Sequence, residues 1–337
     1  MKPESPNLLA RCLRDYFTEH LPRLRGMSPH TILNYRDSLV LLLRFLADHR
    51  KRSVQDLDLE DFEPNRIVTF LNYLEQERKN SVPTRNVRLA AIHAFFRYVG
   101  AQHPEQLERS QRILGVPFKR GSQRVIQYLE RTEIEAVLSR IDRSFPDGRR
   151  DYALLATMFN TGARVQEVID LRARDLQLTR PYQMRLFGKG RKERLCPLWP
   201  QTAQVLRAHC EERQIDLASE TRVFLNHRGA PLTRFGVRYI LGRHLERARA
   251  TVATLARKRL HPHSMRHSTA VALLKSGVDL STISQWLGHA SLSTTNRYAS
   301  IDLDLKRQAI ARVKPISGGR RPSWRKNETV LEWLEKL

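Results

Sequence analysis

The segment HPHSMRHSTAVALLKSGVDLSTISQWLGHASLSTTNRY, residues 261–298, carries the pattern that decides the fold around it. His263 and Arg266 are three positions apart, so a helix places both side chains on one face. The apolar run between 270 and 274 would bury that helix, and Gly277 suits the position just past its end. The pattern therefore predicts a helix that presents an imidazole and a guanidinium together.

A second short helix is expected from about Asp279 to Leu287, and it leads directly into His289. Tyr298 follows nine residues later, in a polar turn rich in threonine. Imidazole, guanidinium and phenol groups are all compatible with a bound phosphate. The segment by itself indicates a phosphate-binding helix with a phenol close to it.

Two charged residues upstream supply more of such a site. A mostly buried helix is expected at 151–161, and Gly162 would end it just before Arg164 and Glu167, which are again three positions apart. A planar guanidinium grips a phosphate through two hydrogen bonds and stays charged at any working pH. Arg164 and Arg266 are therefore the candidates for stabilising a phosphate whose oxygens gain charge during transfer.

Two strands are expected at 183–187 and 193–198, on either side of the basic, glycine-rich turn GKGRK. Lys189 in this turn suits proton donation to a departing alkoxide, although a turn that only binds a phosphate backbone is the alternative. Tyr298 offers a hydroxyl nucleophile, because neighbouring cations lower the pKa of a phenol from its ordinary value near ~10. An ordinary half-buried tyrosine is the alternative for that residue.

The N-terminal region predicts a separate helical domain at 1–100, with four helices between 7 and 99. One of them begins at Ser28 and Pro29, a favourable pair for a helix start. Basic and turn-forming residues predict a linker at 101–124, which leaves a catalytic domain at 125–314 and a tail at 315–337. The expected fold class is mainly α with a small β-sheet, an α+β protein.

The 337-residue chain carries a formal net charge of +24, and the basic excess is uneven. Residues 1–120 contain 20 Lys and Arg against 14 Asp and Glu, whereas the rest contains 39 against 21. Such an excess favours nucleic acid as the partner. A membrane partner is disfavoured, because basic residues are spread over many elements and no apolar run approaches roughly 20 residues. The N-terminus lacks a signal peptide's apolar region, so a cytoplasmic, nucleoid-associated protein is expected.

The histidines and cysteines raise the question of a metal site. His261, His263 and His267 are close enough in sequence to approach one ion, but no HExxH motif, adjoining carboxylate or second cluster accompanies them. The cysteines, Cys12, Cys196 and Cys210, form no CxxC or disulfide framework, which fits a reducing compartment. Neither a metal nor a cofactor is expected, and the turn at 188–192 lacks the GxxxxGK[ST] pattern of a Walker A loop.

Taken together, these motifs resemble the tyrosine recombinase family of phage integrases and Xer-like proteins. The matching segments occur in the family's order: TGARVQE at 161–167, GKGRKER at 188–194, HPHSMRH at 261–267, LGH at 287–289 and STTNRY at 293–298. Five ordered motifs at the family's spacing are far more specific than any one of them. The resemblance is strong over about 120–300, and the region at 7–99 is similar to the family's core-binding, SAM-like DNA-binding domain.

The resemblance implies a DNA strand transferase that needs no metal. Tyr298 would attack a DNA phosphate, giving a 3′-phosphotyrosyl link and a free 5′-hydroxyl. Lys189 would protonate the leaving 5′-oxygen, and Glu167 would orient the site through Arg164. Because the link is reversible, the 5′-hydroxyl of a partner strand would replace the original one, which is site-specific recombination.

The remaining matching residues are implied to bind the phosphate. Arg164, Arg266 and His263 would hold its non-bridging oxygens, and His289 would donate a hydrogen bond to it. Together with Tyr298, Lys189 and Glu167 they make up the seven implied catalytic residues.

The family also implies a clamp around double-stranded recombination sites, and a tetramer on DNA in which the C-terminal segment contacts a neighbouring protomer. A mobile-element integrase is preferred over housekeeping resolution, because the chain is longer and more basic than the latter requires. A topoisomerase IB-like DNA relaxase and a non-catalytic DNA-binding accessory protein are the alternatives. The need for partner recombinases stays open.

Overall fold

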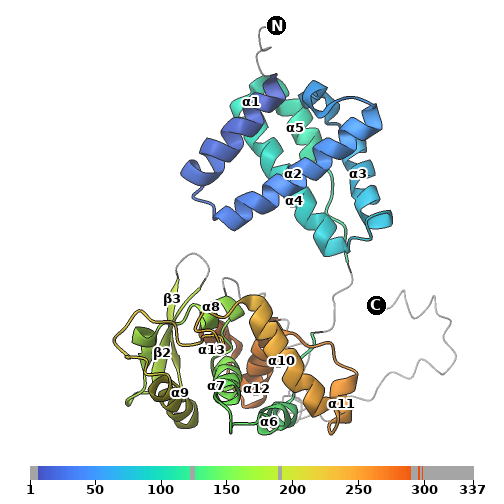
Figure 1. The fold of residues 1–337 in the computed structure, drawn as a ribbon. Helices are drawn as coiled ribbons and strands as arrows, with labels where there is room; N and C mark the ends of the chain where they lie inside the picture. The colour runs from blue at the N-terminus through green and yellow to red at the C-terminus, as the bar shows by residue number, and fades with distance from the viewer. Residues whose placement is uncertain (1–6, 122–125, 189–191, 290–294, 297, 299–337) are drawn as a thin grey trace, which may run out of the picture. The chain divides into compact units, whose positions relative to one another are not determined.

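The computed structural model describes residues 7–121, 126–188, 192–289, 295–296 and 298 (Figure 1). The chain forms two compact units, Met1–Arg124 and Val125–Leu337. Helices dominate the described parts of both units, and the second also contains a small antiparallel sheet. The expected fold class, mainly α with a small β-sheet, is therefore confirmed.

The described residues of the first unit form helices joined by short connections. Its elements are α1 (Leu8–Asp15), the π-helical segment η1 (Tyr16–Leu24), α2 (Pro29–Arg50), the 3₁₀ turns η2 (Val54–Asp56) and η3 (Leu59–Asp61), α3 (Pro64–Gln76), α4 (Val82–Gln102), the 3₁₀ turn η4 (Pro104–Gln106) and α5 (Leu107–Leu114). α2 begins as expected, because Ser28 Oγ accepts a hydrogen bond from the Thr31 N–H at 3.3 Å. The apolar faces of these helices bury one core, in which Leu42 and Phe70 are fully buried.

The sequence predicts a linker over 101–124, and the structure differs there. α4 continues to Gln102, and α5 then packs along α4. Ile113 of α5 is fully buried and belongs to the core of the first unit. In the sequence, Ile113 is flanked by charged and turn-forming residues, so the sequence alone shows no helical period of apolar residues there.

The second unit contains the sheet and the remaining helices. Its described elements are α6 (Arg131–Ser139), α7 (Pro146–Thr161), α8 (Val165–Ile169), the 3₁₀ turn η5 (Ala173–Asp175), β1 (Leu176–Gln177), β2 (Gln183–Phe187), β3 (Glu193–Pro197), α9 (Pro200–Glu212), α10 (Arg234–Arg249), α11 (Ala253–Ala256), α12 (Pro262–Lys275) and α13 (Leu280–Leu287). The strands pair antiparallel in the order β1-β2-β3, with Met184 opposite Cys196. The hairpin expected from the sequence is present, and residues 189–191 of its turn lie outside the described residues.

The helix that the sequence segment 261–298 predicts is α12, which contacts α7, α10 and α13 (Figure 1). Gly162 caps the end of α7 and Gly288 caps the end of α13, with φ of +60° and +63°. This left-handed backbone favours glycine because it has no β-carbon to clash. The carbonyl groups at both helix ends point at α12, where Arg266 binds them.

No helix in the described part of the chain is long and apolar enough to span a membrane. The tail at 315–337, which is expected to contact a neighbouring protomer, lies outside the described residues.

Candidate active site

Arg164 and Glu167 lie at the start of α8, directly after the turn that ends α7. The Glu167 carboxylate accepts hydrogen bonds from the main-chain N–H of Arg164 at 2.8 Å and from its Nη1 at 2.7 Å. The Glu167 side chain is only 3% exposed, whereas that of Arg164 is 35% exposed. A buried carboxylate therefore fixes a guanidinium that remains partly accessible.

Arg194, from β3, completes this charge cluster, and sequence reasoning did not single it out. Its Nη1 and Nη2 donate to the two carboxylate oxygens of Glu167 at 3.1 and 2.6 Å, and its Nε donates to the Trp286 carbonyl at 3.0 Å. Burial raises the pKa of the Glu167 carboxyl, but the hydrogen bonds and charge of Arg194, with those of Arg164, hold that pKa below its ordinary value. The signal available in the sequence was its position at the end of the basic segment GKGRKER.

Arg266 in α12 is almost completely buried, with 1% of its surface exposed. Its Nη1 donates to the carbonyl of Gly162 at 2.9 Å, and its Nη2 donates to that of Leu287 at 2.6 Å. Burial, followed by the charge of Arg164, lowers its pKa to about 10, so the guanidinium stays charged at neutral pH. The carbonyl ends of two helices, which carry partial negative charge, compensate this buried cation.

Both arginines meet at the end of α13. The Gly288 carbonyl accepts a hydrogen bond from Arg164 Nη2 at 3.2 Å, next to the Leu287 carbonyl that Arg266 binds. A β-carbon at position 288 would lie 3.1 Å from the Arg194 side chain. The backbone conformation and the close approach of a guanidinium therefore both favour glycine at 288.

Two imidazoles lie beside these guanidinium groups. Burial is the main cause that lowers the pKa of His263 and His289 to about 4, and the charges of Arg266 and Arg164 add to it. Both rings are thus neutral at pH 7 and can donate a hydrogen bond to an anion. His289 Nδ1 lies 2.7 Å from the hydroxyl of Thr295, whereas His263 is exposed to solvent.

Tyr298 lies beside the histidines, with 2% of its surface exposed. Its hydroxyl is 2.8 Å from Nδ1 of His267, and its ring stacks on that of His289 at a centroid distance of 6.3 Å. The rings of His267 and His263 meet edge to face at 4.6 Å. His267 is a second residue that sequence reasoning left out of the site, although it stands next to Arg266 in the segment HPHSMRH.

The structure brings six of the seven predicted residues into one cluster: Arg164, Glu167, His263, Arg266, His289 and Tyr298. The seventh, Lys189, lies outside the described residues. Fixed cations, neutral imidazoles and a phenol together suit nucleophilic attack on a phosphate. Within the described residues, no group of three His, Cys, Asp or Glu side chains is placed to hold a metal ion.

Two family models match the chain. Residues 127–303 match the phage integrase family, and residues 15–103 match the N-terminal SAM-like domain of phage integrases. The first of these covers the cluster described above, and the second covers most of the helical first unit.

Individual proteins of the same kind also match. The protein y4rC of Sinorhizobium fredii, named an integrase/recombinase, is 38% identical over 329 residues, which covers 98% of each chain. Tyrosine recombinase XerC of Oceanobacillus iheyensis is 31% identical over 316 residues, covering 90% of this chain and 96% of its own. The XerH site-specific recombinase, solved on its difH substrate in a pre-cleavage complex, shares the fold with a TM-score of 0.65 at 22% identity, covering 90% of this chain and 87% of its own. The chain therefore belongs to the phage integrase family, the tyrosine recombinases that its motifs resemble.

Proposed function

We propose that this chain is a site-specific DNA recombinase that cuts and rejoins double-stranded DNA through a 3′-phosphotyrosyl intermediate. Its family consists of enzymes that cleave DNA and transfer strands. The observation that carries the proposal is the cluster in which Arg164, Arg266 and neutral imidazoles lie around the phenol of Tyr298. DNA as the substrate is supported by the related XerH, which was solved on its DNA substrate before cleavage.

In the proposed reaction, the phenolic oxygen of Tyr298 attacks a phosphorus atom of the DNA backbone. A bond from phosphorus to Tyr298 forms, the bond to the 5′-oxygen breaks, and Lys189 gives that oxygen a proton. His267 Nδ1, which lies 2.8 Å from the hydroxyl, would take the phenolic proton in the tautomer that carries its own proton on Nε2. The bond between Tyr298 and the DNA is itself a phosphate ester. The 5′-hydroxyl of another strand can therefore attack it, reverse the step and rejoin the DNA.

The two arginines stabilise the charge that develops on the phosphate oxygens. Arg266 is fixed by two carbonyl groups and Arg164 by Glu167, so neither has to reorganise when that charge appears. His263 and His289 add neutral hydrogen-bond donors. Glu167 is a positioning residue, because it acts on the phosphate through the guanidinium groups that it holds.

A nicked suicide substrate tests this function, with candidate sites taken from the DNA that flanks the coding sequence. The nick releases a short fragment after cleavage, so a covalent protein–DNA adduct accumulates. We expect the wild-type protein to form this adduct, and Tyr298→Phe to bind the same DNA without forming it. An adduct with Tyr298→Phe, or none with wild-type protein bound to its site, would overturn the proposal. Relaxation of any supercoiled plasmid, without recombinant product, would indicate a topoisomerase-like relaxase instead.

We also propose that the chain is the integrase of a mobile element and acts as four copies on two DNA sites. The net charge of +24 and the similarity to an integrase/recombinase support this assignment. Since DNA is the proposed substrate, we place its action at the nucleoid in the cytoplasm. Analytical ultracentrifugation on paired sites should give the mass of four chains, and removal of 315–337 should reduce that mass. Recombination by the purified chain alone would show that no partner recombinase is needed, and activity as a single copy would exclude the tetramer.

A further inference from the structure

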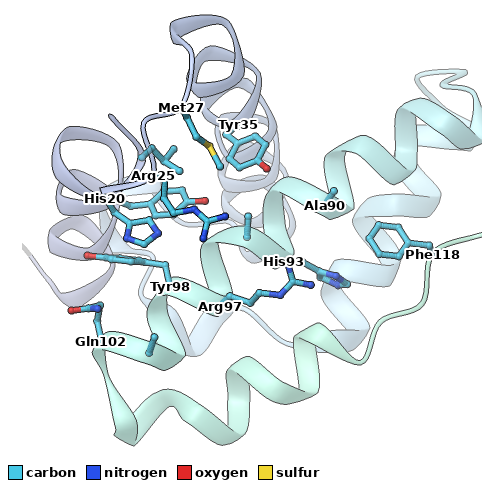
Figure 2. A pocket seen from close by; sticks show the side chains of 14 residues that line it. His20, Arg25, Met27, Tyr35, Ala90, His93, Arg97, Tyr98, Gln102 and Phe118 are labelled. Carbon is cyan, nitrogen blue, oxygen red and sulfur yellow. The ribbon is translucent and has the colours of Figure 1, made fainter. Parts of the chain in front are cut away.

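A pocket of about 360 Å³ lies in the first unit, which contributes none of the recombination residues. Its walls come from η1, α2, α4 and the segment after α5 (Figure 2). This volume falls within the range of small-molecule sites, roughly 300–1,000 Å³.

Two local features distinguish the walls of this pocket. η1 winds as a π-helix over Tyr16–Leu24, a rare form that often occurs at functional sites. On α4, Ala90, Ala94 and Ala101 recur on one face, so their small side chains leave room where larger ones would fill the pocket.

Two residues that line the pocket each carry a buried polar atom that makes no hydrogen bond of good geometry within the described residues. Tyr16 is 1% exposed and its hydroxyl is unpaired, and His93 is 3% exposed and its Nε2 is unpaired. Leaving a buried polar group unpaired costs roughly 1–3 kcal/mol, and proteins pair nearly all such groups. Both atoms are therefore places where a bound molecule would supply the missing partner.

Two arginines give the pocket a positive charge. Arg25 and Arg97 are exposed, no hydrogen bond or ion pair of either side chain occurs within the described residues, and no Asp or Glu lines the pocket. Arg97 lies beside His93 in Figure 2. Burial and the charge of Arg97 lower the pKa of His93, and burial and the charge of Arg25 lower the pKa of His20. The pocket therefore combines neutral imidazoles with two unpaired cations and selects against a cationic ligand.

Aromatic rings supply flat surfaces along the same pocket. The Tyr98 ring lies 4.8 Å from that of His20 and 5.1 Å from that of Tyr16, measured between centroids. Phe118 meets the ring of His93 edge to face at 5.3 Å. Stacking a planar base on an aromatic side chain contributes roughly 1–3 kcal/mol, so a planar ligand gains most here.

We propose that this pocket binds a small organic anion with a planar, hydrogen-bonding ring system, the chemistry of a nucleoside monophosphate. The ring stacks against Tyr98 and supplies partners to Tyr16 Oη and His93 Nε2. The anionic group lies at Arg25 and Arg97, since guanidinium groups bind phosphate through paired hydrogen bonds. Both parts of the ligand are required. An inorganic anion would leave Tyr16 Oη and His93 Nε2 without a hydrogen-bond partner, and an apolar ligand would leave Arg25 and Arg97 without a negative charge to bind.

Isothermal titration calorimetry on the full-length, DNA-free protein tests the proposal. The probes are the four ribonucleoside 5′-monophosphates, with adenosine and inorganic phosphate as the separated parts. We expect one saturable site per chain for at least one monophosphate, and binding about tenfold or more tighter than either part, equivalent to ~1.4 kcal/mol. If none of the four monophosphates binds saturably at millimolar concentration, the proposal is overturned.

Two pocket variants locate that binding. Arg97→Ala removes a surface cation, and Ala94→Leu fills the pocket, so each should weaken the monophosphate by about tenfold or more. Arg112→Ala on α5 and Ala10→Leu on α1 are the matched controls, because both positions are exposed and outside the pocket. Binding that survives both pocket variants belongs to another site and overturns the assignment. Thermal melting checks that Ala94→Leu is folded. If Ala94→Leu does not fold, the result with Arg97→Ala alone decides whether the monophosphate binds in this pocket.

A short single-stranded oligonucleotide, with and without a 5′-phosphate, separates two sources of the ligand. If the phosphorylated strand displaces the bound monophosphate, the pocket accepts a strand end. If it does not, the ligand is the free nucleotide, and in either result the pocket chemistry proposed here stands.

Discussion

Glu167 joins two of the guanidinium groups in the active-site cluster. Its buried carboxylate accepts hydrogen bonds from Arg164, directly before α8, and from Arg194 on β3. Removing one partner from a buried ion pair leaves the other charge without compensation in a low dielectric. Removing the Glu167 carboxylate would therefore disturb the positions of both the Arg164 and the Arg194 side chain.

Replacing Glu167 by Gln should destabilise the protein by about 3 kcal/mol, because the shape is kept but two guanidinium groups lose their counter-charge. Urea unfolding measures this loss, and the suicide-substrate assay should show adduct formation falling by more than DNA affinity. Glu135→Gln is the control, since that carboxylate forms an exposed pair with Arg131 and should contribute less than about 1 kcal/mol. Equal losses in the two variants would contradict the role given to Glu167.

His263 and His289 predict a dependence of stability on pH. Their pKa values are lowered from 6.5 to about 4 in the folded protein. Between these pH values the unfolded chain binds more protons than the folded chain. The stability that the two neutral rings contribute is therefore complete above pH 6.5 and is lost as the pH falls toward 4. Urea midpoints across this range should show that the double variant with Gln at both positions loses less stability on acidification.

At the scale of elements, the site depends on where two helices end. Arg266 of α12 binds carbonyl groups at the ends of α7 and α13, so the turn that follows each helix sets the position of the guanidinium. The left-handed glycines Gly162 and Gly288 make both turns. Helix ends, more than loop side chains, thus build the cationic part of the site.

Gly162→Ala tests this dependence. A β-carbon at position 162 would lie 2.4 Å from Leu287 Cδ2, in addition to the strain of a φ of +60°. Gly277 has a φ of +84° but no atom within 4 Å of the added β-carbon, so Gly277→Ala isolates the strain, about 1 kcal/mol. We expect Gly162→Ala to lower the melting temperature further and to slow adduct formation, because the carbonyl that holds Arg266 is displaced. The same loss in both variants would mean that packing at Gly162 has no part in the site.

The elements that local residues specify were predictable from the sequence. Ser28–Pro29 starts α2 and Asp279 caps α13, because each acts within one helical turn. η1 was not predictable, since a π-helix breaks the 3.6-residue period on which helix prediction rests. Arg194 was missed for another reason. Its contact with Glu167 spans 27 residues and forms only when the hairpin packs beside α8 through β2.

At the scale of the whole molecule, the charge of +24 predicts steep salt dependence of DNA binding. If the chain contacts 6–10 phosphates, its affinity should fall by roughly 10³–10⁵ between 50 and 200 mM salt, because bound counterions are released on association. Fluorescence anisotropy at several salt concentrations gives the slope. Tyr298→Phe should share the wild-type slope, since it removes no charge. A flat dependence would contradict DNA as the partner of the basic surface.

The contacts of Arg194 bear on protein engineering. The hairpin that ends at β3 is anchored to Glu167 of α8 and to the Trp286 carbonyl of α13, which belong to distant parts of the sequence. A chimaera that takes only residues 183–197 from a relative would bring an arginine at position 194 whose original partners are on the relative's own helices. That arginine would not be matched to Glu167 and the Trp286 carbonyl of this chain. To exchange this hairpin between recombinases, α8 and the end of α13 should thus be transferred together with it.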